Sequence, residues 1–198
     1  MTITRGQFLS GSAKGSAALL VAGGVLGEFV DSAAAALPSN DTVYVRLLVG
    51  AELLASDFYS QAINASVTNS AVTKYLKLAY FNEQQHYQSV AGILSGEGVT
   101  PAVSNDITFT YPSGTFGSQD SIVALAKSLE DMTLGTYLGA MSQIQTTSLL
   151  TGLSQIAACE AQHASYFTSA SGGRAFRLSF PPALSITQAS NALAVYSS

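Results

Sequence analysis

Two short segments of this chain carry metal-binding residue types at the spacing of one helical turn. They read Glu-Gln-Gln-His over residues 83–86 and Glu-Ala-Gln-His over residues 160–163. Residues three apart lie on one face of a helix, so the carboxylate and the imidazole of each segment can reach the same point in space. The two histidines of these segments are the only ones in the chain.

Two further glutamates precede the segments at nearly equal distances. Glu52 lies 31 residues before Glu83, and Glu130 lies 30 residues before Glu160. Four carboxylates and two imidazoles match the ligand set of a carboxylate-bridged di-iron or di-manganese site inside a four-helix bundle. The predicted metal ligands are therefore Glu52, Glu83, His86, Glu130, Glu160 and His163.

Charge balance favours a pair of divalent ions at such a site. Four ionised glutamates would carry a charge of −4, which two divalent ions neutralise. Without metal, some of these carboxylates would have to take up protons, because like charges this close cannot all ionise. Oxygen and nitrogen ligands suit Fe or Mn, and also Zn in vitro. The alternative is a bundle whose polar residues are only hydrogen-bonded or solvated, but two in-register copies of the motif favour metal binding.

Capping residues and apolar periodicity predict four helices that would position these ligands. They span about residues 42–65, 71–94, 121–146 and 148–169, and each has one predicted ligand or motif on its inward stripe. The segment 95–118 is rich in Gly, Pro, Ser and Thr, and we expect it to be partly extended. Two helical hairpins packed as such a bundle need one long crossover of this kind between the second and third helices.

The two halves of the chain repeat each other. Glu52 and Glu130 differ by 78 positions, the glutamates of the two motifs by 77, and Tyr59 and Tyr137 by 78. Each half is thus a helical hairpin that carries a glutamate and then Glu-x-x-His. Such a repeat predicts a pseudo-twofold metal site between the hairpins.

Several polar residues near the predicted ligands have open roles. Tyr59 and Tyr137 lie two turns from Glu52 and Glu130 on the same stripes. We favour core tyrosines with satisfied hydroxyls, and the alternatives are hydrogen bonds to ligands or a role as electron carriers. Cys159 is the single cysteine, which excludes an internal disulfide, and we interpret it as a small buried apolar residue. Candidates for outer partners of the histidines are Gln84, Gln85 and Gln162.

These motifs resemble those of ferritin-like four-helix-bundle proteins, and more narrowly of secreted bacterial ferritin-like domain proteins, some of them desiccation-related. The resemblance covers about residues 42–170. It implies an all-α fold: a ferritin-like four-helix bundle with a long crossover between helices 2 and 3. By analogy, Glu83 and Glu160 would bridge two metal ions, Glu52 and Glu130 would be terminal ligands, and each histidine would hold one ion.

The N-terminus, residues 1–37, reads as an export signal. Arg5 and Lys14 supply positive charge, residues 16–30 are mostly apolar and small, and residues 32–36 offer small-residue cleavage sites. The apolar run is short for a membrane span. An uncleaved anchor or an assembly helix is the alternative. We therefore expect an exported protein (periplasmic, cell-surface or extracellular), with membrane contact only through this segment if it is retained.

Length and composition limit the domain organisation and the binding partners that we expect. The 198 residues fit one bundle domain over 38–170, followed by a C-terminal extension over 171–198 packed on it as a short helix or strand. Only 10% of residues are charged, the net charge is −4 and no basic run is present, so nucleic acid is not an expected partner. So few charges suit a secreted protein, a homo-oligomer, or a chain covered by other protein subunits.

Two function classes follow from this sequence. The first is an exported oxidoreductase with two Fe or two Mn ions, of ferroxidase, catalase or peroxidase type, acting on peroxide, oxygen or Fe(II). The second is a structural or assembly protein in which the metal serves stability only. A weaker third reading is iron storage in a closed shell. The resembling family as a whole includes iron storage, manganese catalases, peroxide reduction and oxygenases, so the motif indicates the metal site rather than the reaction.

Overall fold

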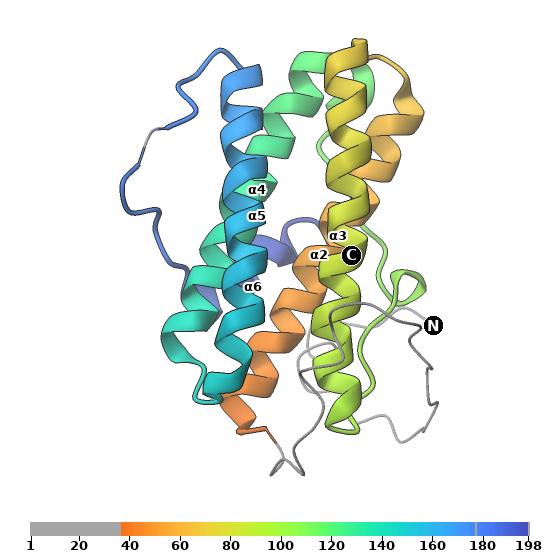
Figure 1. Ribbon diagram of the computed structural model, residues 1–198. Helices are drawn as coiled ribbons and strands as arrows, with labels where there is room; N and C mark the ends of the chain where they lie inside the picture. Colours follow the sequence, from red (N-terminus) through yellow and green to blue (C-terminus); the bar gives the residue numbers. More distant parts are fainter. Residues whose placement is uncertain (1–36, 177, 198) are drawn as a thin grey trace.

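The computed structural model describes residues 37–176 and 178–197, so almost all of the expected export signal lies outside the described residues. The fold is all-α, as predicted from the sequence (Figure 1). Its helices are α2 (Ser39–Ala65), α3 (Ser70–Gly96), α4 (Gln119–Gln143), α5 (Leu150–Ala170) and the short α6 (Ile186–Ala194). None of the helices in these described residues has the length and hydropathy needed to span a membrane.

The four long helices form two antiparallel hairpins. α2 packs along α3, α4 packs along α5, and α2 and α4 join the two hairpins. α3 and α5 lie on the same side of the bundle and touch each other much less extensively (Figure 1). The predicted crossover is present: residues 97–118 run the length of the bundle from the end of α3 to the start of α4. It includes two short 3₁₀ helices, η2 (Ser104–Asp106) and η3 (Thr115–Gly117).

Side-chain caps fix where several helices begin. Asn69 accepts a hydrogen bond from the backbone N–H of Val72 at the start of α3, and Ser118 accepts one from Ser121 at the start of α4. These caps satisfy N–H groups that have no partner within the helix. The predicted starts of both helices are therefore correct to within two residues.

The end of the third helix is where the prediction was wrong. We expected it to reach residue 146, but α4 ends at Gln143. The buried carboxylate of Asp41, on α2, accepts the backbone N–H groups of Gln145 and Thr146 at 2.8–3.2 Å. A partner more than 100 residues away thus replaces the helix carbonyls, and a 3₁₀ turn, η4 (Thr147–Leu149), leads into α5.

The C-terminal segment returns across α4 at two glycines. Leu184 donates its backbone N–H to the carbonyl of Gly135 at 2.8 Å, and a Cβ placed on Gly139 would lie 1.8 Å from the carbonyl oxygen of Leu184. Only glycine allows the two backbones to approach this closely. The chain then forms α6, which packs on α2 and α4, and ends in a single bridge between Ser197 and Phe109 of the crossover. Of the two predicted forms for this segment, the helix is correct.

Replacing Gly139 by alanine is expected to destabilise the fold by about 1–3 kcal/mol, the usual cost of overpacking. The new methyl group would force the backbone near Leu184 to move, since no flexible side chain can give way. Denaturant unfolding measures the change. The matched control is Gly92→Ala on α3, where nothing lies within 4 Å. There alanine should stabilise the helix by about 0.5–1 kcal/mol, and equal effects at the two positions would contradict the close approach.

Two apolar clusters fill the bundle, and the predicted metal ligands lie between them. Along α3, one cluster takes the stretch 72–79, the ligands follow at 83–86, and the other cluster begins at Val90. α4 and α5 show the same division around their own ligands. The polar site is therefore surrounded by apolar side chains at both ends, which excludes water and strengthens electrostatic interactions inside it.

Candidate metal centre

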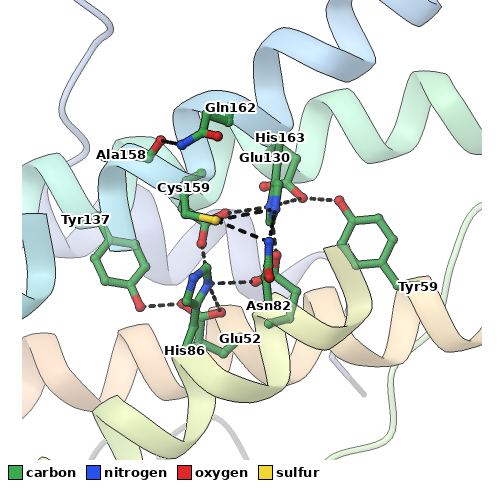
Figure 2. A network of polar contacts seen from close by, with 12 residues as sticks. Glu52, Tyr59, Asn82, His86, Glu130, Tyr137, Ala158, Cys159, Gln162 and His163 are labelled. Atoms are coloured by element: carbon green, nitrogen blue, oxygen red, sulfur yellow. Dashed lines mark hydrogen bonds and ion pairs between the residues drawn. The ribbon is translucent and has the colours of Figure 1, made fainter. Parts of the chain in front are cut away.

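All six residues predicted as metal ligands lie together in the centre of the bundle. The four glutamates are 0–1% exposed, His163 is 1% exposed and His86 is 9% exposed. Their ligand atoms form two overlapping groups, each with all atoms within 4.8 Å of one another: Glu52, Glu83, His86 and Glu160, and then Glu83, Glu130, Glu160 and His163. Glu83 and Glu160 belong to both groups, which is what bridging carboxylates require. Every long helix contributes at least one of the six (Figure 2).

The Nδ1 nitrogen of His86 faces the carboxylates of the first group. It lies 2.8 Å from Glu160 on α5, 3.5 Å from Glu83 one turn earlier on its own helix, and 3.7 Å from Glu52 on α2. The imidazole and three carboxylates therefore surround one point, as the spacing of the motif predicts.

His163 repeats this arrangement across the pseudo-twofold axis. Its Nδ1 nitrogen lies 2.9 Å from Glu83, 3.5 Å from Glu160 and 3.6 Å from Glu130. Each histidine thus comes closest to the shared glutamate of the opposite hairpin. The two halves of the sequence repeat generate two nearly equivalent ligand sets.

The chemistry of the unpartnered atoms fits a pair of divalent cations. Eight buried atoms of these residues make no hydrogen bond: Glu52 Oε2, both oxygens of Glu83, His86 Nδ1, Glu130 Oε2, both oxygens of Glu160 and His163 Nδ1. A buried polar atom without a partner costs about 1–3 kcal/mol, and more if charged. Carboxylate oxygens and imidazole nitrogens are the ligands that Fe, Mn and Zn accept, and the six residues offer them within two compact groups. These carboxylate and histidine clusters can therefore hold metal.

Two buried tyrosines fix the remaining oxygens of the non-shared glutamates. Tyr59 on α2 donates its hydroxyl hydrogen to Oε1 of Glu130 on α4, and Tyr137 on α4 donates to Oε1 of Glu52 on α2. Both tyrosines are core residues with satisfied hydroxyls, as the favoured interpretation had it, and the alternative hydrogen bond to a glutamate is also present. Each bond crosses to the other hairpin. Each bond leaves the other oxygen of that carboxylate buried without a hydrogen bond. The oxygen of Glu130 that accepts from Tyr59 is also the one that lies 3.6 Å from Nδ1 of His163.

The electrostatics of the cluster favour bound protons when no cation is present. Burial, and then the charge of Glu160, raises the pKa of Glu83 well above its usual value, and burial raises the pKa of Glu130 to about 8. Burial would also raise the pKa of Glu160, but the two histidines, whose Nδ1 atoms lie 2.8 and 3.5 Å from its oxygens, outweigh burial and lower that pKa to about 2. Burial lowers the pKa values of His86 and His163, yet close contacts with Cys159 and the surrounding carboxylates reverse this and raise both.

Outside the ligands, the structure corrects two sequence interpretations. Cys159 is half-buried rather than a core residue, and its Sγ lies 3.6 Å from Nε2 of His163. The glutamines of the motifs do not contact the histidines: Gln84 donates to Tyr80, and Gln162 donates to the carbonyl of Ala158. Gln85 is exposed.

The residue that contacts a histidine instead is Asn82, whose carboxamide lies 3.1 Å from Nε2 of His163. Sequence reasoning missed it. One signal was available: Asn82 immediately precedes Glu83, as Cys159 precedes Glu160, so the sequence repeat pairs the two residues.

Removing the hydroxyl of Tyr59 is expected to destabilise the metal-free protein by about 1–3 kcal/mol, because Tyr59→Phe leaves a buried oxygen of Glu130 without a partner. Denaturant unfolding after chelation measures this loss. The control is Tyr80→Phe on α3, which removes a hydroxyl whose hydrogen bond from Gln84 lies at the surface, and it should change stability by less than about 0.5 kcal/mol. Wild-type stability in Tyr59→Phe would show that the carboxylate does not depend on the tyrosine.

The comparisons with known proteins agree with this geometry. A family profile described as a ferritin-like domain matches residues 40–173, which is most of the chain and includes all six clustered residues. None of the curated proteins searched matches the chain.

Proposed function

Because the chain belongs to the ferritin-like domain family, we propose that it binds two iron or two manganese ions and performs oxidoreductase chemistry on peroxide, oxygen or Fe(II). The observation that carries this proposal is the pair of overlapping, buried ligand groups, each with its ligand atoms within 4.8 Å of one another, which share Glu83 and Glu160. Eight buried oxygen and nitrogen atoms of these residues have no hydrogen-bond partner.

Bound ions of this kind would supply redox and Lewis-acid chemistry toward a small oxidant. The protein would supply the surroundings. Two apolar clusters exclude water at either end, and the tyrosines hold the terminal carboxylates in one orientation. The approach for a small molecule would lie between α3 and α5, where His86 has 11% of its side chain exposed while the glutamates have almost none.

The proposal includes export and self-association. The N-terminal charge and apolar run support export, and a content of 10% charged residues supports faces covered by other copies or subunits. N-terminal sequencing of the mature protein tests the first: a start near residue 37 is expected, and a start at Met1 would argue for a retained segment. Light scattering tests the second and also identifies a closed, iron-storing shell by its size.

The direct test begins with elemental analysis of protein purified from its native source without added metal. Close to two Fe or two Mn per chain is expected. The loaded protein is then mixed with hydrogen peroxide, with oxygen and with Fe(II), and the matched control is Glu83→Gln, which removes a shared ligand. Turnover in the wild type alone supports the proposal. Absence of metal after anaerobic Fe(II) titration would overturn it.

A structural role for the metal is the second candidate. Every long helix contributes a ligand, so bound ions would join both hairpins. This role predicts that chelation lowers the unfolding midpoint while the loaded protein turns over neither peroxide nor Fe(II). Turnover would exclude it as the sole function.

A further inference from the structure

The outward nitrogens of the two histidines lie in different surroundings. Because Nδ1 of His163 faces Glu83 at 2.9 Å, its Nε2 points away from the carboxylates, toward the side between α3 and α5. There it lies 3.1 Å from the carboxamide nitrogen of Asn82 and 3.6 Å from Sγ of Cys159 (Figure 2). The carboxamide of Asn82 also donates to that sulfur at 3.4 Å.

The chemistry of a metal-bound imidazole determines what this carboxamide does. An imidazole that binds a cation through Nδ1 keeps its hydrogen on Nε2, where it can only donate. A carboxamide presents an oxygen at one end and a nitrogen at the other, so a half-turn of the Asn82 side chain places its oxygen against Nε2. An acceptor in that place fixes the imidazole ring and raises its basicity toward the metal.

The sequence repeat places the thiol of Cys159, a poorer partner, beside His86, in the position that the carboxamide of Asn82 takes beside His163. Asn82 and Cys159 each lie four residues before a histidine, and each precedes a shared glutamate. The pseudo-twofold axis therefore exchanges the carboxamide with the thiol. A thiol is a weak hydrogen-bond acceptor. Within residues 37–176 and 178–197, no carboxamide contacts His86, which is also the more exposed histidine, at 11% of its side chain against 2% for His163.

We propose that Asn82 is a positioning residue that makes the two metal positions unequal, so that the position held by His163 binds its ion more tightly than the position held by His86. This inference rests on the two-ion site proposed above. It adds an order of loading: the His163 position fills first.

Anaerobic titration with Co(II), followed by its visible absorption, tests the order. The wild type should bind two ions in two steps whose affinities differ by about 10-fold or more, the effect typical of outer partners. Asn82→Leu, which has similar volume but no acceptor, should weaken the tighter step about 10- to 100-fold. Asn82→Asp should restore it, because a carboxylate is a stronger acceptor. Metal-free Asn82→Leu should unfold at the wild-type denaturant concentration.

Two further variants assign the steps. His163→Ala should abolish the tighter step, and His86→Ala the weaker one. Cys159→Asn places a carboxamide on both sides of the axis. The affinity of the weaker Co(II)-binding step should therefore rise toward that of the tighter step. Because Cys159→Asn leaves Asn82 in place, the affinity of its weaker step tests the inference even if Asn82→Leu folds poorly.

The outcomes separate this inference from the proposed function. A wild type that binds two Co(II) ions with equal affinity, or steps unchanged in Asn82→Leu and Cys159→Asn, would overturn the positioning role and leave the two-ion site intact. A wild type that binds no Co(II) would overturn both.

Discussion

Replacing Glu83 by glutamine is expected to abolish binding of both metal ions rather than one. Glu83 belongs to both ligand groups, and both of its oxygens are buried without hydrogen bonds. The amide removes one negative charge and one of the two oxygens. Because loss of an outer partner alone costs about 10- to 100-fold in affinity, loss of a shared ligand should weaken both steps by at least about 100-fold. Ions retained per chain after equilibrium dialysis against Co(II) measure the effect.

Two glutamates provide matched controls for this result. Glu97→Gln changes a glutamate at the end of the same helix, far from the cluster, and should leave two ions bound. Glu52→Gln changes a ligand that belongs only to the His86 group, so it should weaken one ion and leave the other. If Glu83→Gln held one ion at wild-type affinity, Glu83 would be a terminal ligand and the assignment of shared carboxylates would be wrong.

Metal binding near pH 7 is expected to release at least about one proton per ion. Burial raises the pKa of Glu83 and raises the pKa of Glu130 to about 8, and close contacts with Cys159 and the carboxylates raise the pKa values of both histidines. Raised pKa values favour the protonated forms of these groups near pH 7, and a cation must displace those protons. Release of one proton per ion makes affinity fall about 10-fold for each unit of decreasing pH. The dependence weakens above about pH 8, where Glu130 has already lost its proton.

Calorimetric titration with Co(II) in two buffers of different ionisation enthalpy counts these protons. Release of fewer than one proton per ion would contradict the protonated cluster.

The stability of the metal-free fold depends on pH in the opposite direction to metal affinity. A carboxyl whose pKa is raised in the folded state stabilises the fold at low pH, and this stabilisation is lost as pH rises from about 4.5 to about 8 for Glu130. Chelated protein should therefore lose stability across that range.

The meeting of the six clustered residues was predictable because it follows from short-range spacing within helices and from the sequence repeat. Helical periodicity places Glu and His three residues apart on one face, and the repeat offset of 77–78 relates the two halves, so the sequence alone predicted that these six residues would meet. Burial of a glutamate such as Glu52 at 0% exposure also followed from its place in an apolar stripe.

The features missed by sequence reasoning all depend on distant parts of the chain. Asn82 and Cys159 meet across α3 and α5, and no pattern within one helix encodes that contact. Asp41 ends α4 from more than 100 residues away. Gly139 reads in sequence as a weak helix former, whereas its role is to admit the backbone of Leu184.

The even division of ligands between the hairpins has a consequence for assembly. Glu52, Glu83 and His86 come from the first hairpin, and their three counterparts come from the second, so each half alone presents an incomplete site. The reciprocal tyrosine bonds add a further mutual dependence. The two repeated hairpins are joined covalently by the crossover over residues 97–118. Association of the two halves is therefore an intramolecular step. A tether of this kind keeps the effective concentration of one half near the other in the millimolar range, so the site assembles at any protein dilution.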